Sequence, residues 1–308
     1  MGKKKTFSAA AKDERFDFEA VVAEAYRQNP ALETAVFFVD ISKEQVAHPN
    51  RETLNEILHF ISDSDAGKKF IQPQIQECQR NKASYCHFGG ESKFVYIYSG
   101  TDRPRFFSPR VSEAQEMTFI FDHEFAHAHI TSGGSDNRFL AENTADAYAL
   151  IRHIQRFGTG TALAEEIVAF RARDTAFRAN GIFNFSCRAL EHVLEVARKV
   201  DYTSLTPAET SALAEQVALE FTPDAPMLKS LHGAFAPLHT NGTPESLAKI
   251  SLGTKDAEVL KWSATVLKAL LADVVAPPQG SSEIKPDKEW NARMKEISRR
   301  QEKMAHPA

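Results

Sequence analysis

The sequence predicts an α+β protein, with a small mixed sheet and its helices first and a mostly helical part after it. Three observations predict this class. Short apolar runs rich in strand-forming residues fall in the first third of the chain. A Gly89-Gly90 pair separates two of these runs, which is typical of a β-hairpin. From Ser112 onward, apolar residues recur mainly at helical spacing.

Composition limits the possible functions. The chain has 308 residues, with 37 Lys+Arg against 41 Asp+Glu and a net charge of −4. This balance argues against a whole-chain clamp on nucleic acid, so no nucleic-acid partner is expected. No run of about 18 apolar residues occurs, which predicts no membrane span. Three cysteines and a start without an apolar signal region predict a cytoplasmic protein, with export by a different route left open.

The first part of the chain alternates helical and extended segments. We expect residues 1–12 to be a disordered lead-in, and the pair Asn29-Pro30 should end the first helix. The remaining expected elements are a helix over 14–28, a strand over 35–39, helices over 53–61 and 68–82, hairpin strands over 84–88 and 94–98, and an extended piece at 106–107.

The second part is expected to be almost entirely helical. The predicted helices cover 113–131, 137–157, 160–178, 185–200, 207–220, 244–251 and 255–274. Prolines make the stretch between the helices predicted over 207–220 and 244–251 look irregular. The expected organisation is one domain over 13–275, made of an α/β part (13–111), a helix pair (112–158) and a helical part (159–275), then a linker and a charged tail with a solvated helix (276–308).

One motif carries chemistry. Residues His123, Glu124 and His127 form the pattern H-E-x-x-H, on a segment that Ser112 can cap. Residues four apart on a helix are separated by about 40°, so the two imidazoles can bind one Zn²⁺ ion together. Glu124 is turned about 100° from His123, where it can accept a proton. The alternative interpretation is a pair of core histidines with satisfied ring nitrogens.

A second helix brings carboxylates to the same place. Glu142 lies as far after the centre of a Gly-rich turn as His127 lies before it, and Asp146 matches His123 in the same way. Two regular helices joined by such a turn should pack as an antiparallel hairpin, which places each pair at one height. The alternative is a solvated acidic face, but Ala145 leaves that side small and it carries no lysine.

Together these residues resemble a known family. His123-Glu-Phe-Ala-His127 followed by Glu142-x-x-x-Asp146 is similar to the gluzincin zinc metallopeptidases, in particular the minimal gluzincins with a short connecting turn. The resemblance covers residues 112–157. It implies a zincin-like fold and one Zn²⁺ per chain, bound by His123, His127 and Glu142. It also implies that Glu124 is the general base and that Asp146 orients a zinc-binding histidine.

The resemblance implies hydrolysis of a peptide bond in a peptide or protein substrate, by zinc-activated water with Glu124 as general base. In such folds a strand beside the cleft binds the substrate backbone, and Phe94, Val95 and Tyr96 are the best match. The sequence departs from the family at His129, where an apolar residue is usual; helical geometry turns it away from the metal. The residue that stabilises the oxyanion is left open among several tyrosines and His153, His192, His232 and His239.

Two other functions stay open. One is a catalytically silent, zincin-like protein that binds a partner or regulates transcription. The other is a metallohydrolase that acts on a non-peptide amide, although the E-G-C motif of peptide deformylases is missing. The presence of Glu124 favours an enzyme, because binding alone requires no general base. The sequence makes no prediction of the oligomeric state or of side-chain specificity.

Overall fold

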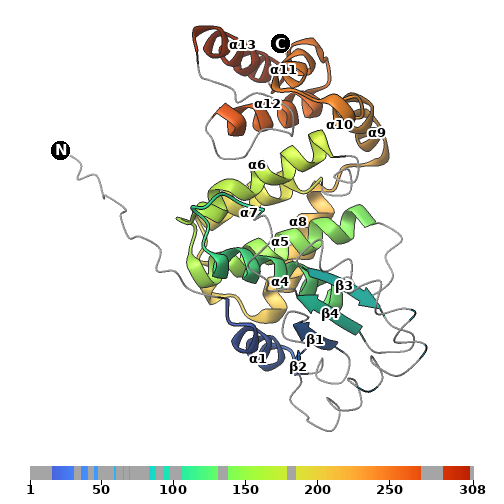
Figure 1. Cartoon of the computed structure of the whole chain (residues 1–308). Helices are drawn as coiled ribbons and strands as arrows, with labels where there is room; N and C mark the ends of the chain where they lie inside the picture. Colours follow the sequence, from blue (N-terminus) through green and yellow to red (C-terminus); the bar gives the residue numbers. More distant parts are fainter. Residues whose placement is uncertain are drawn as a thin grey trace, which may run out of the picture.

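The molecule has a small sheet at one end and a stack of helices beyond it (Figure 1). The computed structural model describes residues 16–30, 36–40, 45–47, 83–87, 93–97, 106–130, 138–178, 185–271 and 287–305, and the single positions 59, 65 and 69. The lead-in 1–12, the linker over 276–282 and the helices predicted over 53–61 and 68–82 lie outside these residues, apart from the single positions.

Four short strands form a mixed sheet in the order β2-β1-β4-β3. Their bounds are β1 (Val36–Asp40), β2 (Gln45–Ala47), β3 (Ala83–His87) and β4 (Lys93–Ile97). Strands β3 and β4 pair in antiparallel fashion, so the predicted hairpin is present. Strand β1 runs parallel to β4 and antiparallel to β2, which makes β4 an interior strand.

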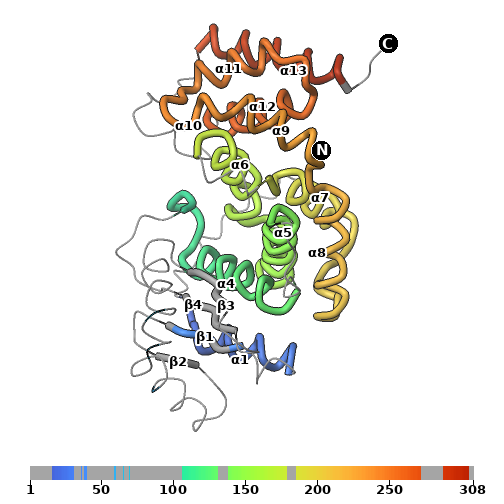
Figure 2. The backbone as a smooth tube through the Cα atoms, turned by 90° about the vertical axis from the view of Figure 1, so that its right-hand side faces the viewer, coloured from blue at the N-terminus to red at the C-terminus, as the bar shows by residue number. Residues whose placement is uncertain are grey.

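Helix α1 (Phe18–Gln28) packs beside the sheet (Figure 2). Asp17 caps it by accepting a hydrogen bond from the backbone N–H of Ala20 at 3.0 Å, and it ends before Asn29, as predicted. The hydroxyl of Tyr26 donates to the carbonyl of Val36 in β1 at 2.6 Å. This buried hydrogen bond ties the helix to the strand.

Helix α4 (Glu113–His129) lies against the sheet, and helix α5 (Arg138–Phe157) lies against α4. Phe38 of β1 is fully buried, and its ring stacks on Phe121 at 5.0 Å between centroids and lies 5.8 Å from Phe125. Burying an aromatic side chain stabilises a fold by about 1.5–3 kcal/mol. These rings therefore hold one face of α4 on the sheet and leave its other sides for α5.

The remaining helices pack alongside α5 or stack beyond it (Figures 1 and 2). They are α6 (Ala162–Phe177), α7 (Cys187–Ala197), a 3₁₀ turn η4 (Tyr202–Ser204), α8 (Pro207–Phe221), α9 (Ala225–Phe235), α10 (Leu238–Asn241), α11 (Pro244–Gly253), α12 (Ala257–Leu271) and α13 (Lys288–Ala305). Helix α12 contacts α6 on one side and α11 and α13 on the other. Within the described residues, no helix is both long and apolar enough to cross a bilayer.

The predicted fold class, α+β and zincin-like, requires correction. Helices account for most of the described residues, whereas the described strands are only three to five residues long. The protein is therefore predominantly helical, with a small sheet at one end. The prediction gave too much weight to short apolar runs, which form strands here but do not set the class.

Three smaller expectations also differ from the structure. The stretch that looked irregular forms α9 and α10, because Pro226 occupies the first turn of α9, where proline is tolerated. Phe106 and Phe107 form a bend and not an extended piece. The tail contains a helix, as predicted, but that helix is not fully solvated, since Trp290 and Ile297 of α13 are buried.

Candidate metal centre

Helix α4 presents two histidines on one side. Ser112 caps the helix, accepting a hydrogen bond from the N–H of Gln115 at 3.2 Å, as its position in the sequence suggested. One turn apart near the other end, His123 and His127 bring their Nε2 atoms within 3.2 Å of each other. His123 is buried and His127 nearly so. Two ring nitrogens this close can share either a proton or a metal ion.

Helix α5 adds a carboxylate to this pair. Glu142 Oε2 lies 3.4 Å from His123 Nε2 and 3.8 Å from His127 Nε2. One ligand atom from each of the three residues lies within 4.8 Å of the others. The residues that connect the helices, 131–137, lie outside the described part of the chain. The structure thus brings together the three residues that the sequence nominated as metal ligands.

The donor atoms suit a small divalent cation. In a tetrahedral zinc site, ligands about 2.0–2.1 Å from the ion lie about 3.3 Å from one another. The three separations here, at 3.2, 3.4 and 3.8 Å, are close to this value. Two imidazoles and a carboxylate are also the donor set of several catalytic zinc sites. Both the chemistry and the spacing of the residues therefore fit zinc.

Asp146 contacts the other nitrogen of His123. Its Oδ1 lies 2.9 Å from His123 Nδ1, and the carboxylate is completely buried. A carboxylate at this place keeps the ring proton on Nδ1 and leaves the Nε2 lone pair for a metal. Asp146 also accepts hydrogen bonds from Arg171 of α6 at 2.5 Å and from the hydroxyl of Ser186, the residue before α7.

The charges around the two histidines favour the protonated form of His123 and the neutral form of His127. Burial opposes charge on His123, but its bonds to Asp146 and Glu142 raise the pKa of His123 to about 10. Burial and then the neighbouring charge of His123 lower the pKa of His127 to about 4. Despite burial, Arg171 and His123 hold the pKa of Asp146 below its usual range. Without a metal, the site therefore holds one charged and one neutral imidazole between two carboxylates.

Two further residues of α4 have separate surroundings. Glu124 is partly exposed, and its charge contributes to raising the pKa of His123, so it lies near the ligands. His129 points elsewhere: its Nδ1 lies 2.7 Å from the carbonyl of Phe125, and its Nε2 lies 3.3 Å from the hydroxyl of Ser211 on α8. His129 is therefore held by α8 and is not part of the donor group.

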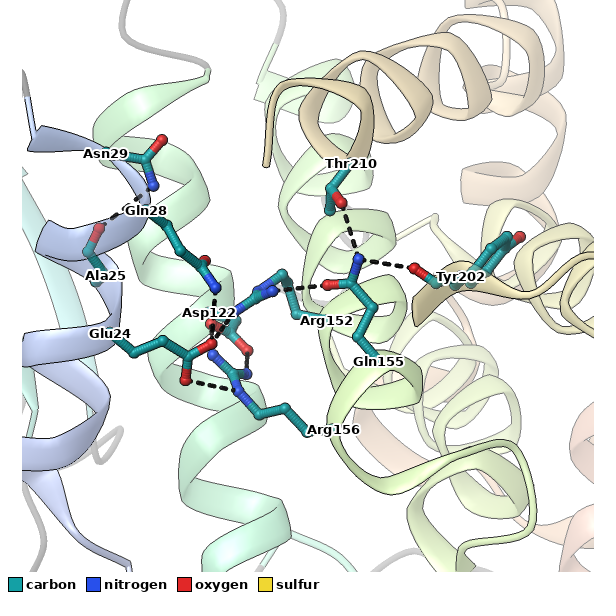
Figure 3. Close-up of polar contacts among 10 residues, drawn as sticks. All are labelled: Glu24, Ala25, Gln28, Asn29, Asp122, Arg152, Gln155, Arg156, Tyr202 and Thr210. Atoms are coloured by element: carbon teal, nitrogen blue, oxygen red, sulfur yellow. Dashed lines mark hydrogen bonds and ion pairs between the residues drawn. The ribbon is translucent and has the colours of Figure 1, made fainter. Parts of the chain in front are cut away.

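A buried ionic cluster fixes α4 from another side (Figure 3). Asp122, directly before His123, pairs with Arg156 of α5. Arg156 also lies 3.2 Å from Glu24 of α1, and Glu24 pairs with Arg152. Three helices thus share this cluster, which ties α4 to α1 and α5 at the residue next to His123.

The strand predicted to bind substrate is an interior strand of the sheet and not an edge strand. Residues 94–96 lie in β4, which pairs with β1 on one side and β3 on the other. Its backbone groups pair within the sheet on both sides, so Phe94, Val95 and Tyr96 have no free strand edge for the predicted substrate contact. A strand that adds a peptide needs an unpaired edge. Among the described strands, the edges of the sheet are β2 and β3.

The four other histidines considered for the oxyanion occupy different environments. His153 is buried, and its Nε2 lies 2.7 Å from the hydroxyl of Thr161. His192 on α7 packs on Phe221, with ring centroids 4.7 Å apart. The pair formed by His232 and His239 lies in α9 and α10. None of them belongs to the donor group found among the described residues.

Sequence reasoning missed Arg171 and Ser186. They follow Asp146 by 25 and 40 positions, and neither stands in a motif that marks a role. The one available signal was that Arg171 follows an apolar turn, Ile167 to Phe170, of its predicted helix, which indicates a charge in need of a partner. No family model, curated protein or solved structure matches the chain.

Proposed function

We propose that the protein is a zinc-dependent metallopeptidase. The observation that carries the proposal is the convergence of His123, His127 and Glu142, with Asp146 on the remaining nitrogen of His123. Three protein ligands leave one position for water or substrate, which is typical of catalytic and not of structural zinc sites. An acidic residue beside the ligands, Glu124, supplies the base that hydrolysis requires.

Each residue has a defined role in this proposal. When bound, zinc lowers the pKa of a water molecule and polarises the substrate carbonyl. His123, His127 and Glu142 hold the ion, and Asp146 keeps the proton of His123 on Nδ1. Glu124 accepts a proton from the attacking water and then transfers it to the nitrogen of the leaving amine. The products are a carboxylate and an amine.

Metal content and peptide hydrolysis test this function together. The full-length protein is loaded with zinc, dialysed and analysed for metal, then screened against a broad peptide mixture with and without a chelator. We expect about one zinc per chain and cleavage that the chelator abolishes. Glu124→Gln should retain zinc and lose at least about 100-fold in turnover, the lower range for a general base. Glu113→Gln, in the first turn of the same helix, should retain both.

The outcomes separate the competing functions. Absence of bound zinc in the wild-type protein would overturn the proposal. Zinc bound without cleavage of any peptide would favour a binding or regulatory protein, or a hydrolase of non-peptide amides. Full turnover in Glu124→Gln would show that another group acts as the base.

A further inference from the structure

We infer that Arg171 and Ser186 are positioning residues of the metal centre, which act on the metal by holding Asp146 in the orientation that His123 requires. The inference rests on the proposed function, because it assumes that His123 binds a metal. It extends the centre beyond the helix pair to α6 and to the start of α7. Neither residue contacts a ligand atom of the donor group directly.

Both oxygens of Asp146 are engaged. Oδ1 accepts from His123 Nδ1 at 2.9 Å and from an Arg171 nitrogen at 2.5 Å, and Oδ2 accepts from the hydroxyl of Ser186. The Asp146 side chain has no solvent-exposed surface. A buried carboxylate keeps a fixed orientation only where its partners surround it, since water does not reach it. Arg171 and Ser186 therefore determine which way Oδ1 faces.

Ser186 gives an independent sign of this role. It occupies the N-cap position of α7, where a serine side chain normally accepts a hydrogen bond from the first turn of its helix. Here the side chain makes no such capping bond and donates to Asp146 instead. The side chain of Ser186 is thus used to hold this carboxylate and not to cap its own helix.

Arg171 is equally committed to the carboxylate. Its side chain is only 13% exposed, and its guanidinium lies 5.6 Å from the centre of the Phe170 ring. A buried arginine at this place supplies both a counter-charge and a directed donor, which a lysine reproduces only in part. Removal of Arg171 would leave Asp146 free to turn toward other donors, and His123 would lose its fixed ring orientation.

Zinc affinity is the direct readout. Residues that orient a metal-binding histidine typically contribute 10–100-fold to metal affinity. We expect Ser186→Ala to weaken zinc binding by about 10-fold and Arg171→Met by up to about 100-fold, measured by competition with a chromophoric chelator. Arg173→Met on the same helix is the matched control, because Arg173 packs on Phe170 and lies 3.6 Å from Asp174 instead. The control should bind zinc as tightly as the wild-type protein.

A double-mutant cycle separates positioning from general damage. In an Asp146→Asn background, Arg171→Met should cause little further loss of zinc affinity, because the group through which it acts is already altered. A purely structural role would give additive losses. Cobalt-loaded Ser186→Ala should also show an altered visible absorption spectrum, since that spectrum reports coordination geometry.

The outcomes distinguish this inference from the proposed function. Unchanged zinc affinity and cobalt spectra in Ser186→Ala and Arg171→Met, with zinc still bound, would overturn the inference and leave the metallopeptidase proposal intact. Wild-type protein that binds zinc no better than His123→Ala would overturn the proposed function itself. If Arg171→Met does not fold, Ser186→Ala and Arg171→Lys test the inference. Arg171→Lys should then bind zinc less tightly than the wild-type protein, because lysine replaces the guanidinium only in part.

Discussion

Arg156 of α5 forms an ion pair with Asp122 of α4, the residue that directly precedes His123. Asp122 is buried, and Arg156 is largely so. The same guanidinium reaches Glu24 of α1, so these contacts join α1, α4 and α5 (Figure 3). The charged groups next to His123 are thus largely shielded from solvent.

Breaking the ion pair between Arg156 and Asp122 should lower the free energy of unfolding. Arg156→Met leaves the carboxylate of Asp122 buried without its counter-charge, which typically destabilises a protein by about 3–5 kcal/mol. We expect a loss of that order in the free energy of unfolding, measured by urea denaturation. Lys199→Met is the control, because Lys199 pairs with Glu195 at 3.0 Å on the surface, where both side chains are more than half exposed. The control should change stability by less than about 1 kcal/mol. Equal effects of the two substitutions would contradict the role of the buried cluster.

His153 should make stability depend on pH. Burial, and then the nearby charge of Arg156, lower the pKa of His153 to about 3. The unfolded chain has a histidine pKa of about 6.5, so it binds the proton more readily than the folded chain. The stability from neutral His153 is present above about pH 6.5 and is lost as the pH falls toward about 3, with about 2 kcal/mol gone by about pH 5.

The comparison of His153→Gln with the wild-type protein isolates this effect. Glutamine keeps a polar group near Thr161 but does not titrate. The free energy of unfolding is measured by urea denaturation at pH 7 and at pH 5, with a chelator present. From pH 7 to pH 5 it should fall by about 2 kcal/mol more in the wild-type protein than in the variant. The same drop in both proteins would show that other groups cause the pH dependence.

Zinc should stabilise the fold, because the folded chain brings the ligands together and the unfolded chain does not. At free zinc about 100–1,000 times the Kd, the free energy of unfolding should rise by about 3–4 kcal/mol, and a chelator should reverse the rise. His127→Gln should lose most of this gain in thermal denaturation. His129→Gln should keep it, since His129 contacts Phe125 and Ser211 instead. Equal zinc stabilisation of both variants would place the metal elsewhere.

Gly158 ends α5 in a conformation that requires glycine. Its φ is +78°, and its N–H donates to the carbonyl of Ile154 at 2.8 Å. A Cβ here meets no atom within 4 Å, so the cost of Gly158→Ala is conformational, about 1–2 kcal/mol. Gly160→Ala, at a second open position, should change stability by less than about 1 kcal/mol. A melting experiment on both variants checks the difference.

Local signals predicted the helices of the candidate centre well. Ser112 marked the start of α4, the helix predicted over 137–157 matches α5 within one residue at each end, and the spacing around the turn placed Asp146 level with His123. Each of these signals acts within a few residues or through the regular rise of a helix. The sequence could therefore predict that His123, His127, Glu142 and Asp146 lie together.

Contacts between residues far apart in the sequence could not be predicted from it. The position of β4 inside the sheet depends on parallel pairing with β1, more than 50 residues away, and no local pattern encodes strand order. Arg171 and Ser186 meet Asp146 only because α6 and α7 pack against α5 or its neighbours. The proline at the start of α9 misled in the opposite way, since it looked like a helix breaker and is part of a helix start.

Glu166 of α6 accepts hydrogen bonds from the backbone N–H of Ser108 at 3.0 Å and from its hydroxyl at 2.6 Å. These bonds fasten the segment that leads into α4 to a helix that comes after α5. The segment before α4 and helix α6 are thus tied together across the α4–α5 pair, so local unfolding of one should loosen the other. A piece of the polypeptide that stops after α5 lacks Glu166, so it should hold the segment before α4 less firmly than the intact chain does.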